Sequence, residues 1–334
     1  MTAAATHGKA GAPSDARLYA VLGLLLVVLA VASLVIGDVA LSPAALFVPP
    51  GSIILEEIRL PRLLLGILMG GSLGLSGAAL QGLLRNPLAE PGVIGISASA
   101  GLGAVIVFYF GLASVIPLVL PFAGFAGGAA AVALLYALAG RGASSVTLIL
   151  AGIAISSFAS SLTAVALNLA PSPYAALEIA FWLLGSLADR SMADVALIVA
   201  PVLLGWVLLG STGRALDALT LGDATAQSLG VNLGGLRLRI IFGTALAVGA
   251  SVAVAGSIAF VGLVVPHLLR PFVGHEPGRL LWPSALGGAA LLLASDIAAR
   301  LIPTATELRP GVITALIGAP FFFALVLAQR RVQP

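Results

Sequence analysis

One short pattern in the chain could do covalent chemistry. The tetrapeptide 74-GLSG-77 places a serine among glycines, and His267 is a candidate base for it, as in an intramembrane serine protease. A nucleophilic serine needs a base within hydrogen-bond reach and donors for an oxyanion, which four residues cannot establish. Small-residue tetrapeptides also arise by chance in a chain with 40 glycines. We therefore expect Ser76 to pack against a neighbouring helix.

Nucleotide and metal chemistry have even less support in the sequence. The only lysine is Lys9, in the polar N-terminal tail, so there is no G-x-x-x-x-G-K-[ST] loop to hold a nucleotide phosphate. The chain has no cysteine, and its three histidines, His7, His267 and His275, are scattered. We expect no ATP hydrolysis, no metal site, no cofactor and no enzymatic activity in this chain.

The composition indicates a membrane protein. Hydrophobic residues make up 60% of the 334 residues and charged residues only 9%, whereas a soluble domain has about a quarter charged residues. A helix needs about 20 apolar residues to cross the hydrocarbon core, and such stretches recur along the whole chain. Their unbroken apolar runs exclude the alternating pattern of a β-barrel. The expected fold class is an all-α polytopic membrane protein.

Ten spans are predicted, with the eighth shortened by Pro266 and several glycines. We expect residues 1–16 to form a polar tail and residues 17–331 a single membrane domain, with the first span retained rather than removed as a signal peptide. A short surface helix that contains Trp182 and ends near Gly185 is expected between the fifth and sixth spans. The predicted spans lie near residues 17–36, 60–84, 93–112, 118–139, 146–169, 193–210, 238–254, 256–269, 280–300 and 310–328.

The distribution of basic residues predicts the orientation. Ten spans put both termini on one side, and cytoplasmic termini follow the positive-inside rule, whereas the reverse orientation violates it. The predicted outer side has Arg59, Arg62, Arg190, Arg300 and Arg309. The predicted cytoplasmic side has Lys9, Arg17, Arg85, Arg141, Arg214, Arg237, Arg239, Arg270, Arg279, Arg330 and Arg331.

The predicted spans contain almost no charge at mid-membrane, because the acidic and basic residues fall at helix ends or in loops. This pattern argues against a proton-coupled carrier, which needs a buried carboxylate relay. A passage would instead be lined with small, weakly polar side chains, and the fifth span offers candidates. Such residues equally suit helix packing. Gly66, Gly70 and Gly74 predict a close helix contact. The candidate lining residues are Ser156, Ser157, Ser160, Ser161, Thr163 and Asn168.

Three long segments resemble the FecCD-type permeases of ABC importers, which carry ferric siderophores, haem and cobalamin. The resemblance extends from about Arg17 to Arg331 and implies a type II importer permease with ten helices per subunit. It also implies a homodimer with the passage on its two-fold axis, two ATPase subunits and a periplasmic binding protein, and no nucleic acid. The segments are 59-RLPRLLLGILMGGSLGLSGAALQGLLRNPLAEPGVIGIS-97, 255-AGSIAFVGLVVPHLLRP-271 and 309-RPGVITALIGAPFFFALVL-327.

The resemblance assigns a role to three arginines. It implies that Arg59, Arg62 and Arg300 dock the binding protein by meeting glutamates on its two lobes. In the predicted topology all three lie at outer helix ends, where such contacts must form. Arginines that anchor helix ends at the membrane surface have the same placement. Exposed ion pairs contribute only about 0–1 kcal/mol, so these contacts would mainly orient and speed docking.

The segment 219-LTLGDATAQSLGVN-232 is similar to the family's coupling segment, which meets the ATPase. Its spacing predicts a short amphipathic helix that suits a groove on a partner or the membrane surface. We favour the partner, because the segment lacks the Lys- and Arg-rich face of interfacial helices. The expected polar contacts are Asp223, Gln227 and Gly230. The expected apolar face comprises Leu219, Leu221, Ala226 and Leu229.

Two further expectations follow from the resemblance. Ser144 and Ser145, in the turn between the fourth and fifth spans, are expected to form the cytoplasmic gate. The segment before 181-FWLLGSL-187 lacks a basic residue, which favours a ferric siderophore as the substrate, followed by cobalamin and then haem. The remaining alternatives are a secondary transporter that works alone, a channel and a membrane-embedded enzyme.

Overall fold

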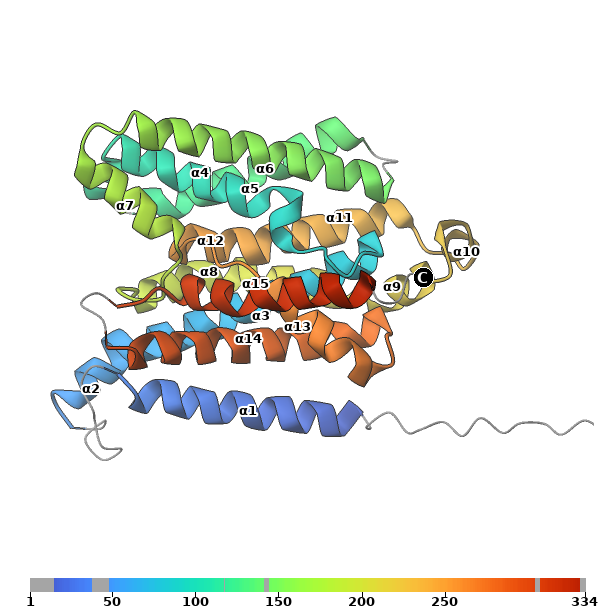
Figure 1. The fold of residues 1–334 in the computed structure, drawn as a ribbon, viewed down its shortest axis with the longest axis horizontal. Coiled ribbons are helices and arrows are strands. Elements are labelled where there is room, and N and C mark those ends of the chain that lie inside the picture. The colour runs from blue at the N-terminus through green and yellow to red at the C-terminus, as the bar shows by residue number, and fades with distance from the viewer. Residues whose placement is uncertain (1–14, 38–47, 117, 141–143, 304–306, 331–334) are drawn as a thin grey trace, which may run out of the picture.

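The computed structural model describes residues 15–37, 48–116, 118–140, 144–303 and 307–330, and all regular structure in these ranges is helical (Figure 1). Seven helical stretches are long and apolar enough to span a membrane, and three shorter apolar helices complete the set of ten. The all-α class is therefore confirmed, and each predicted span corresponds to a helix. The polar tail lies outside the described residues except for its last two, Asp15 and Ala16.

The long spanning stretches are α1 (Asp15–Val35), α3 (Leu60–Leu84), α5 (Val119–Ala139), α6 (Ser145–Asn168), α8 (Met192–Gly210), α11 (Leu233–Thr244) with η5 (Ala245–Gly249) and α12 (Ala250–Ala255), and α14 (Pro277–Leu301). The shorter ones are α4 (Ile96–Tyr109), α13 (Val261–Leu269) with η6 (Arg270–Val273), and α15 (Pro310–Arg330). The connecting helices are α2 (Gly51–Ile54), η2 (Leu55–Arg59), η3 (Pro91–Ile94), η4 (Leu112–Ser114), α7 (Pro173–Leu183), α9 (Gly213–Leu219) and α10 (Asp223–Ser228).

Helix α3 forms the centre of the bundle. In the most apolar 18 residues of the helical stretch Gly51–Leu84, which includes α3, 83% are buried. The backbone of α3 packs directly against that of α14. A Cβ atom added at Gly74 would lie 1.9 Å from the carbonyl oxygen of Ser284, and one at Gly70 would lie 2.4 Å from that of Gly288. Only glycine permits this approach, so the predicted packing role of these glycines is confirmed.

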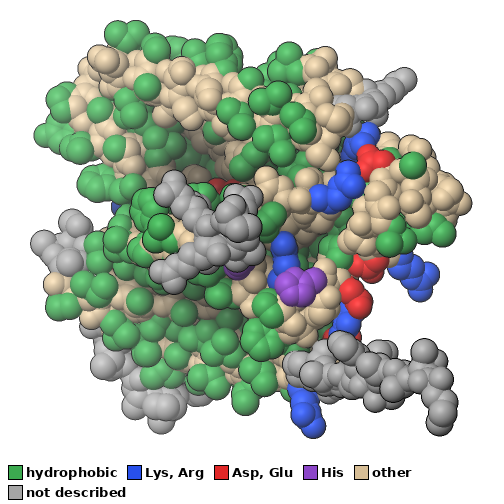
Figure 2. Space-filling view, turned by 45° about the vertical axis from the view of Figure 1, so that its right-hand side comes forward, with side chains coloured by type: hydrophobic (Ala, Val, Ile, Leu, Met, Phe, Trp, Pro, Cys, Tyr) green, Lys and Arg blue, Asp and Glu red, His purple; other side chains and the backbone are tan. Residues whose placement is uncertain are grey.

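The peripheral helices leave apolar side chains on the outside. Of the most apolar 18 residues in each helix, only 11% are buried in α1 and 22% in α6. Figure 2 shows hydrophobic side chains over most of the visible face, while the charged ones gather toward one end. A soluble monomer rarely exposes apolar patches larger than a few hundred Å². This surface therefore suits hydrocarbon or further helices.

The surface helix predicted between the fifth and sixth spans is confirmed. Helix α7 contains the buried Trp182 and is followed by Gly185, whose φ of +70° is a left-handed conformation open to glycine. Helix α13 is short, as Pro266 predicts. The second span is longer than predicted, since α2 and η2 continue it back to Gly51. Arg59 and Arg62 consequently lie inside a continuous helical stretch.

The bundle has two polar ends, which we name after one residue each. At the Arg62 end, α1 and α14 finish and α15 begins (Figure 1). At the Asp223 end, α1 begins, α3 finishes, and α9 and α10 project beyond the spanning helices. The ion pair between Arg279 and Asp15 joins the starts of α14 and α1 at this second end.

Candidate functional site

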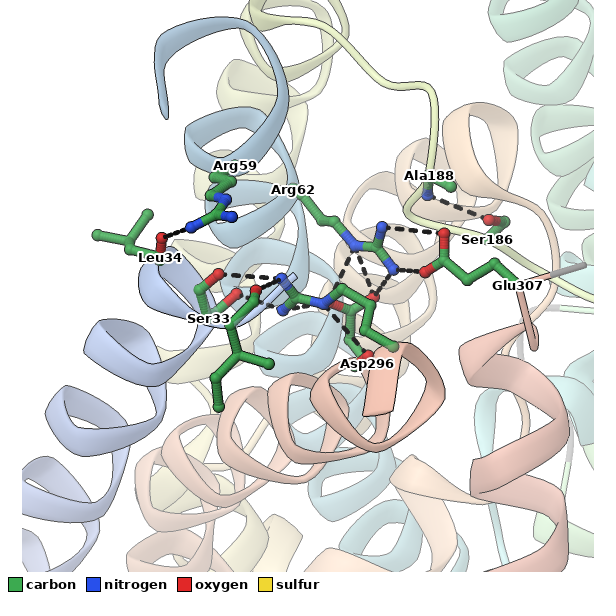
Figure 3. Close-up of polar contacts among 10 residues, drawn as sticks. Ser33, Leu34, Arg59, Arg62, Ser186, Ala188, Asp296 and Glu307 are labelled. Atoms are coloured by element: carbon green, nitrogen blue, oxygen red, sulfur yellow. Dashed lines mark hydrogen bonds and ion pairs between the residues drawn. The ribbon is translucent and has the colours of Figure 1, made fainter. Parts of the chain in front are cut away.

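Arg62, near the start of α3, is held by two carboxylates from distant parts of the chain. Its Nε donates to both oxygens of Asp296 on α14, at 2.9 and 3.0 Å, and its Nη2 lies 2.8 Å from Asp296 Oδ1. Its Nη1 donates to Glu307 Oε2 at 3.3 Å, and its Nη2 also bonds the other oxygen of Glu307. The guanidinium is thus paired along two edges (Figure 3).

Asp296 joins a second arginine to the same network. Its Oδ2 lies 2.9 Å from Nη2 of Arg300, one turn further along α14. The side chain of Asp296 is fully buried, and those of Arg62 and Arg300 are 8% and 5% exposed. A buried carboxylate is stable only when it is paired and hydrogen-bonded, and Asp296 meets this condition by bridging two guanidinium groups.

Arg300 and Arg59 also cap the end of α1. The last carbonyls of a helix have no partner within it, and cations near that end are favourable. Arg300 Nη1 donates to the carbonyl oxygens of Ser33 and Ile36 at 3.0 and 2.6 Å, and Arg59 Nη1 donates to those of Leu34 and Val35 at 2.5 and 2.9 Å. Arg59 and Arg300 therefore fix the end of α1 to the rest of the bundle, although α1 buries little apolar surface of its own.

The three arginines predicted to dock a binding protein are thus close together at the Arg62 end, but their side chains are largely buried. Asp296 and Glu307 are the partners that sequence reasoning missed. Asp296 precedes Arg300 by four residues, a spacing that pairs opposite charges on one helix face. No comparable signal pointed to Arg62, because the pair is 234 residues apart in sequence.

The helix in the predicted coupling segment is shorter than expected. Helix α9 ends at Leu219 and α10 begins at Asp223, because Gly222 has a φ of +98° and a ψ of +157°, outside the helical region. The expectation that Leu219 and Leu221 belong to the same helix as Ala226 is therefore wrong. The expected end of the helix is nearly correct, since α10 ends at Ser228 and Gly230 has a φ of +86°.

The break also divides the expected apolar face. Leu219 and Ala226 are buried at 3% and 0% exposure, whereas Leu221 and Leu229 are each 63% exposed. Gln227 and Gly230 are exposed as well. The two buried residues attach the segment to the bundle, and the two exposed leucines project from the Asp223 end.

Asp223 is the acidic centre of this end. Its Oδ1 accepts a hydrogen bond of 2.7 Å from Arg85, at the end of α3, and its Oδ2 lies 3.5 Å from Arg237 on α11. The side chains of Asp223 and Arg85 are 43% and 46% exposed. Both groups are accessible to water and to a partner.

A basic pocket of about 230 Å³ lies beside these residues and is lined by Arg85, Arg270 and His275, among others. The buried Gln81 organises one wall by accepting a hydrogen bond of 2.5 Å from Arg270 and donating to the carbonyl oxygen of Gly262 at 3.3 Å. That carbonyl needs an outside donor, because Pro266, four residues later, has no N–H. Figure 2 shows basic and histidine side chains gathered on this face.

The predicted lining residues of α6 divide into two groups. Ser156 donates to the carbonyl oxygen of Gly92 at 2.9 Å, so it joins α6 to η3. Ser160 and Asn168 are exposed and Thr163 is half-buried. The candidate gate residue Ser144 is exposed and caps α6 by accepting from the N–H of Thr147 at 3.1 Å, and Ser145 begins the helix. Residues 141–143 lie outside the described part.

Ser76 makes no hydrogen bond to a base in the described structure. Its hydroxyl is fully buried and without a hydrogen-bond partner. The His267 ring instead packs edge-on against Phe321 at a centroid distance of 5.5 Å. The candidate site in the described part of the chain therefore consists of the two charged ends of a bundle with seven helical stretches long and apolar enough to span a membrane.

Comparisons with known proteins agree with this class. The model of the FecCD transport family matches residues 25–328. The Fe(3+)-citrate import system permease protein YfmE of Bacillus subtilis is 38% identical over 94% of this chain and 95% of its own length. The hemin transport system permease protein HmuU of Yersinia pestis is 38% identical over 92% of this chain and 94% of its own.

Two more similarities complete the comparison. The vitamin B12 import system permease protein BtuC of Escherichia coli is 38% identical over 93% of this chain and 94% of its own. A solved metal-chelate type ABC transporter, in an inward-facing conformation, superposes with a TM-score of 0.85 at 34% identity, over 94% of this chain and 99% of that chain. The chain belongs to the FecCD transport family, as the three resembling segments predicted, and has the fold of an ABC importer permease.

Proposed function

We propose that this chain is the transmembrane permease subunit of an ATP-binding-cassette importer in a bacterial inner membrane. It moves a bulky iron complex from periplasm to cytoplasm, most readily a ferric siderophore, and the next choices are cobalamin, which is a cobalt complex, and haem. The family match over residues 25–328 carries this proposal. The named relatives, which are permeases for ferric citrate, hemin and vitamin B12, support the substrate class.

Transport in this proposal follows alternating access. Two copies of the chain enclose a passage on their two-fold axis, and two separate ATPase subunits bind the Asp223 end, which faces the cytoplasm together with both termini. The exposed Leu221, Gln227 and Leu229 and the half-exposed Asp223 support this role, because they project from a segment that is too short to span the membrane. ATP binding and hydrolysis in the partner move this segment and switch the gates.

The passage in this proposal is lined in part by α6. The exposed Ser160 and Asn168 suit a passage wall that binds a bulky substrate only weakly, so that the substrate can be released. Ser156 donates a hydrogen bond to Gly92, which favours a packing role for that serine. Ser144 and Ser145, at the start of α6, form the cytoplasmic gate with their counterparts in the second copy. Small hydroxyl side chains suit a constriction that must open widely.

The Arg62 end docks the periplasmic binding protein. Arg59, Arg62 and Arg300 form the basic part of the docking surface, where they meet acidic side chains on the two lobes of that protein. Their position at one end of the bundle supports this role, and the ion pairs of Arg62 and Arg300 with Asp296 fix two of the guanidinium groups before the partner arrives. Such pre-organisation lowers the entropic cost of binding.

A pull-down tests the proposed function. The tagged protein is purified from its native membranes in mild detergent, and stoichiometric partners are identified by mass spectrometry. A P-loop ATPase should copurify with the natural sequence and be lost from the variant with Asp223→Arg and Gln227→Arg. The matched control is Glu57→Arg, an exposed charge reversal at the opposite end, which should keep the ATPase.

Recovery of the chain alone, with full uptake in proteoliposomes lacking any ATPase, would contradict the proposal. A secondary transporter would then be favoured if uptake followed an ion gradient. A channel would be favoured if the liposomes showed conductance without ATP.

A further inference from the structure

The contacts of Arg62 divide between two edges of its guanidinium group. Asp296 binds the side edge, formed by Nε and Nη2, and Glu307 binds the end edge, formed by Nη1 and Nη2. Each edge of an arginine matches one carboxylate in a bidentate pair. Both edges are therefore occupied from within the chain, and an acidic partner can pair fully with Arg62 only by replacing one carboxylate.

The two carboxylates differ in how easily they can leave. Asp296 is fully buried, belongs to the spanning helix α14 and also pairs with Arg300 at 2.9 Å. Glu307 is 30% exposed and precedes the first turn of α15 by three residues. Among the described side chains, the Glu307 carboxylate forms its ion pair and side-chain hydrogen bonds with Arg62. Glu307 is thus the group that an incoming acid can replace.

Such a replacement conserves the local charge balance. In the ion pairs of this network, Arg62 and Arg300 face Asp296 and Glu307, so two positive charges meet two negative ones. A carboxylate from a partner restores this balance when Glu307 moves into water. A buried guanidinium that lost its end-edge partner without replacement would be strongly disfavoured.

We propose that Glu307 is an internal stand-in for the partner's acidic side chain, and that the binding protein docks by displacing it from the end edge of Arg62. Asp296 is the positioning residue, because it stays bound to the side edge of Arg62 and keeps the end edge oriented toward the incoming carboxylate. This inference rests on the proposed docking function of the Arg62 end. It identifies the partner's contact as a carboxylate that competes with one already present.

The displacement also reaches a spanning helix. Glu307 is joined to α15 through Leu308 and Arg309, and the Arg309 guanidinium lies 5.7 Å from the centre of the Phe181 ring on α7. Release of Glu307 removes one of the contacts that fix the start of α15. Docking at the surface is thereby linked to the beginning of a membrane helix.

Binding measurements on the intact importer in lipid nanodiscs test this proposal. The Kd of the system's own binding protein is compared for the natural sequence, Glu307→Gln and Glu57→Gln. Both variants remove one negative charge from the same end, but Glu57 is exposed in η2 and is not one of the carboxylates paired with Arg62. We expect Glu307→Gln to tighten binding about tenfold and Glu57→Gln to leave it within about twofold, the size of a general charge effect.

A second variant pair separates competition from a general effect. In an Arg62→Lys background the positive charge remains, but a single ammonium lacks the two bidentate edges. Adding Glu307→Gln there should tighten binding much less than in the natural sequence, which a double-mutant cycle measures. Thermal unfolding of each variant checks that it is folded.

The outcomes distinguish the two proposals. Unchanged or weaker binding by folded Glu307→Gln, with normal binding by the natural sequence, would overturn the stand-in role and leave docking intact. Equal tightening in both backgrounds would overturn it as well. Absence of any binding to the natural sequence would refute the docking function itself.

Discussion

The two ends of the bundle have similar chemistry but opposite exposure. At the Arg62 end, Asp296 bridges two arginines with side chains that are at most 8% exposed. At the Asp223 end, one aspartate also faces two arginines, but Asp223 and Arg85 are 43% and 46% exposed. The same kind of charge cluster therefore has a buried version and an open version in one chain.

This difference in exposure separates charges that stabilise the fold from charges that can bind a partner. Breaking a buried pair leaves an uncompensated charge and costs about 3–5 kcal/mol, whereas an exposed pair contributes about 0–1 kcal/mol. The Arg62 network must therefore be retained for the bundle to hold its shape, and only its most exposed member can be exchanged. The Asp223 cluster can be rearranged at little cost, which suits a surface that binds a moving partner.

The largest effect is expected from Asp296→Asn. The substitution leaves Arg62 and Arg300 buried with one carboxylate fewer, so the free energy of unfolding should fall by about 3–5 kcal/mol. The measurement is unfolding of the detergent-solubilised protein, followed by tryptophan fluorescence. The matching change at the open end, Asp223→Asn, should cost no more than about 1 kcal/mol. Similar losses for the two variants would contradict the contrast between the ends.

An intermediate effect is expected from Arg300→Lys. Lysine keeps the charge, but it cannot reproduce the planar fork that reaches Asp296 and the carbonyl oxygens of Ser33 and Ile36 together. Loss of hydrogen bonds to a charged donor should cost about 1.5–3 kcal/mol. Limited proteolysis should then cut the chain faster after α1, while cleavage near α10 stays unchanged. Unaltered cleavage after α1 would show that Arg300 does not hold this helix.

The smallest effect on the folded chain is expected from salt. Raising the ionic strength from about 0.1 M to about 1 M shortens the Debye length from about 10 Å to about 3 Å. The exposed pair of Arg85 and Asp223 should weaken, while the buried pair of Arg62 and Asp296 should not. The loss of free energy of unfolding caused by Arg85→Gln should therefore become smaller as salt is added. The loss caused by Asp296→Asn should stay the same. Equal salt responses would show that burial does not distinguish the two clusters.

Much of the fold could be predicted from the sequence, because membrane helices depend on local apolar runs. The ten spans, the short α13 at Pro266 and a close helix contact at the glycines of α3 all follow from patterns within one segment, whereas the identity of α14 as the partner does not. The pairing of Arg62 with Asp296 and Glu307 could not be predicted in this way, since it depends on which distant helix ends meet. The division of 219–232 was missed because a regular apolar pattern conceals the conformation of Gly222.

Attachment of α1 by Arg59 and Arg300 has a consequence for biogenesis. The first span enters the membrane early in translation, but Arg300 belongs to α14, the ninth span, and is synthesised more than 260 residues after Ser33. Until then α1 has Arg59 as its nearest cap along the chain and few buried contacts of its own. Its final position is thus reached only when the ribosome has made nearly the whole protein, and a chain truncated before α14 would keep the cap from Arg59 but lose the one from Arg300.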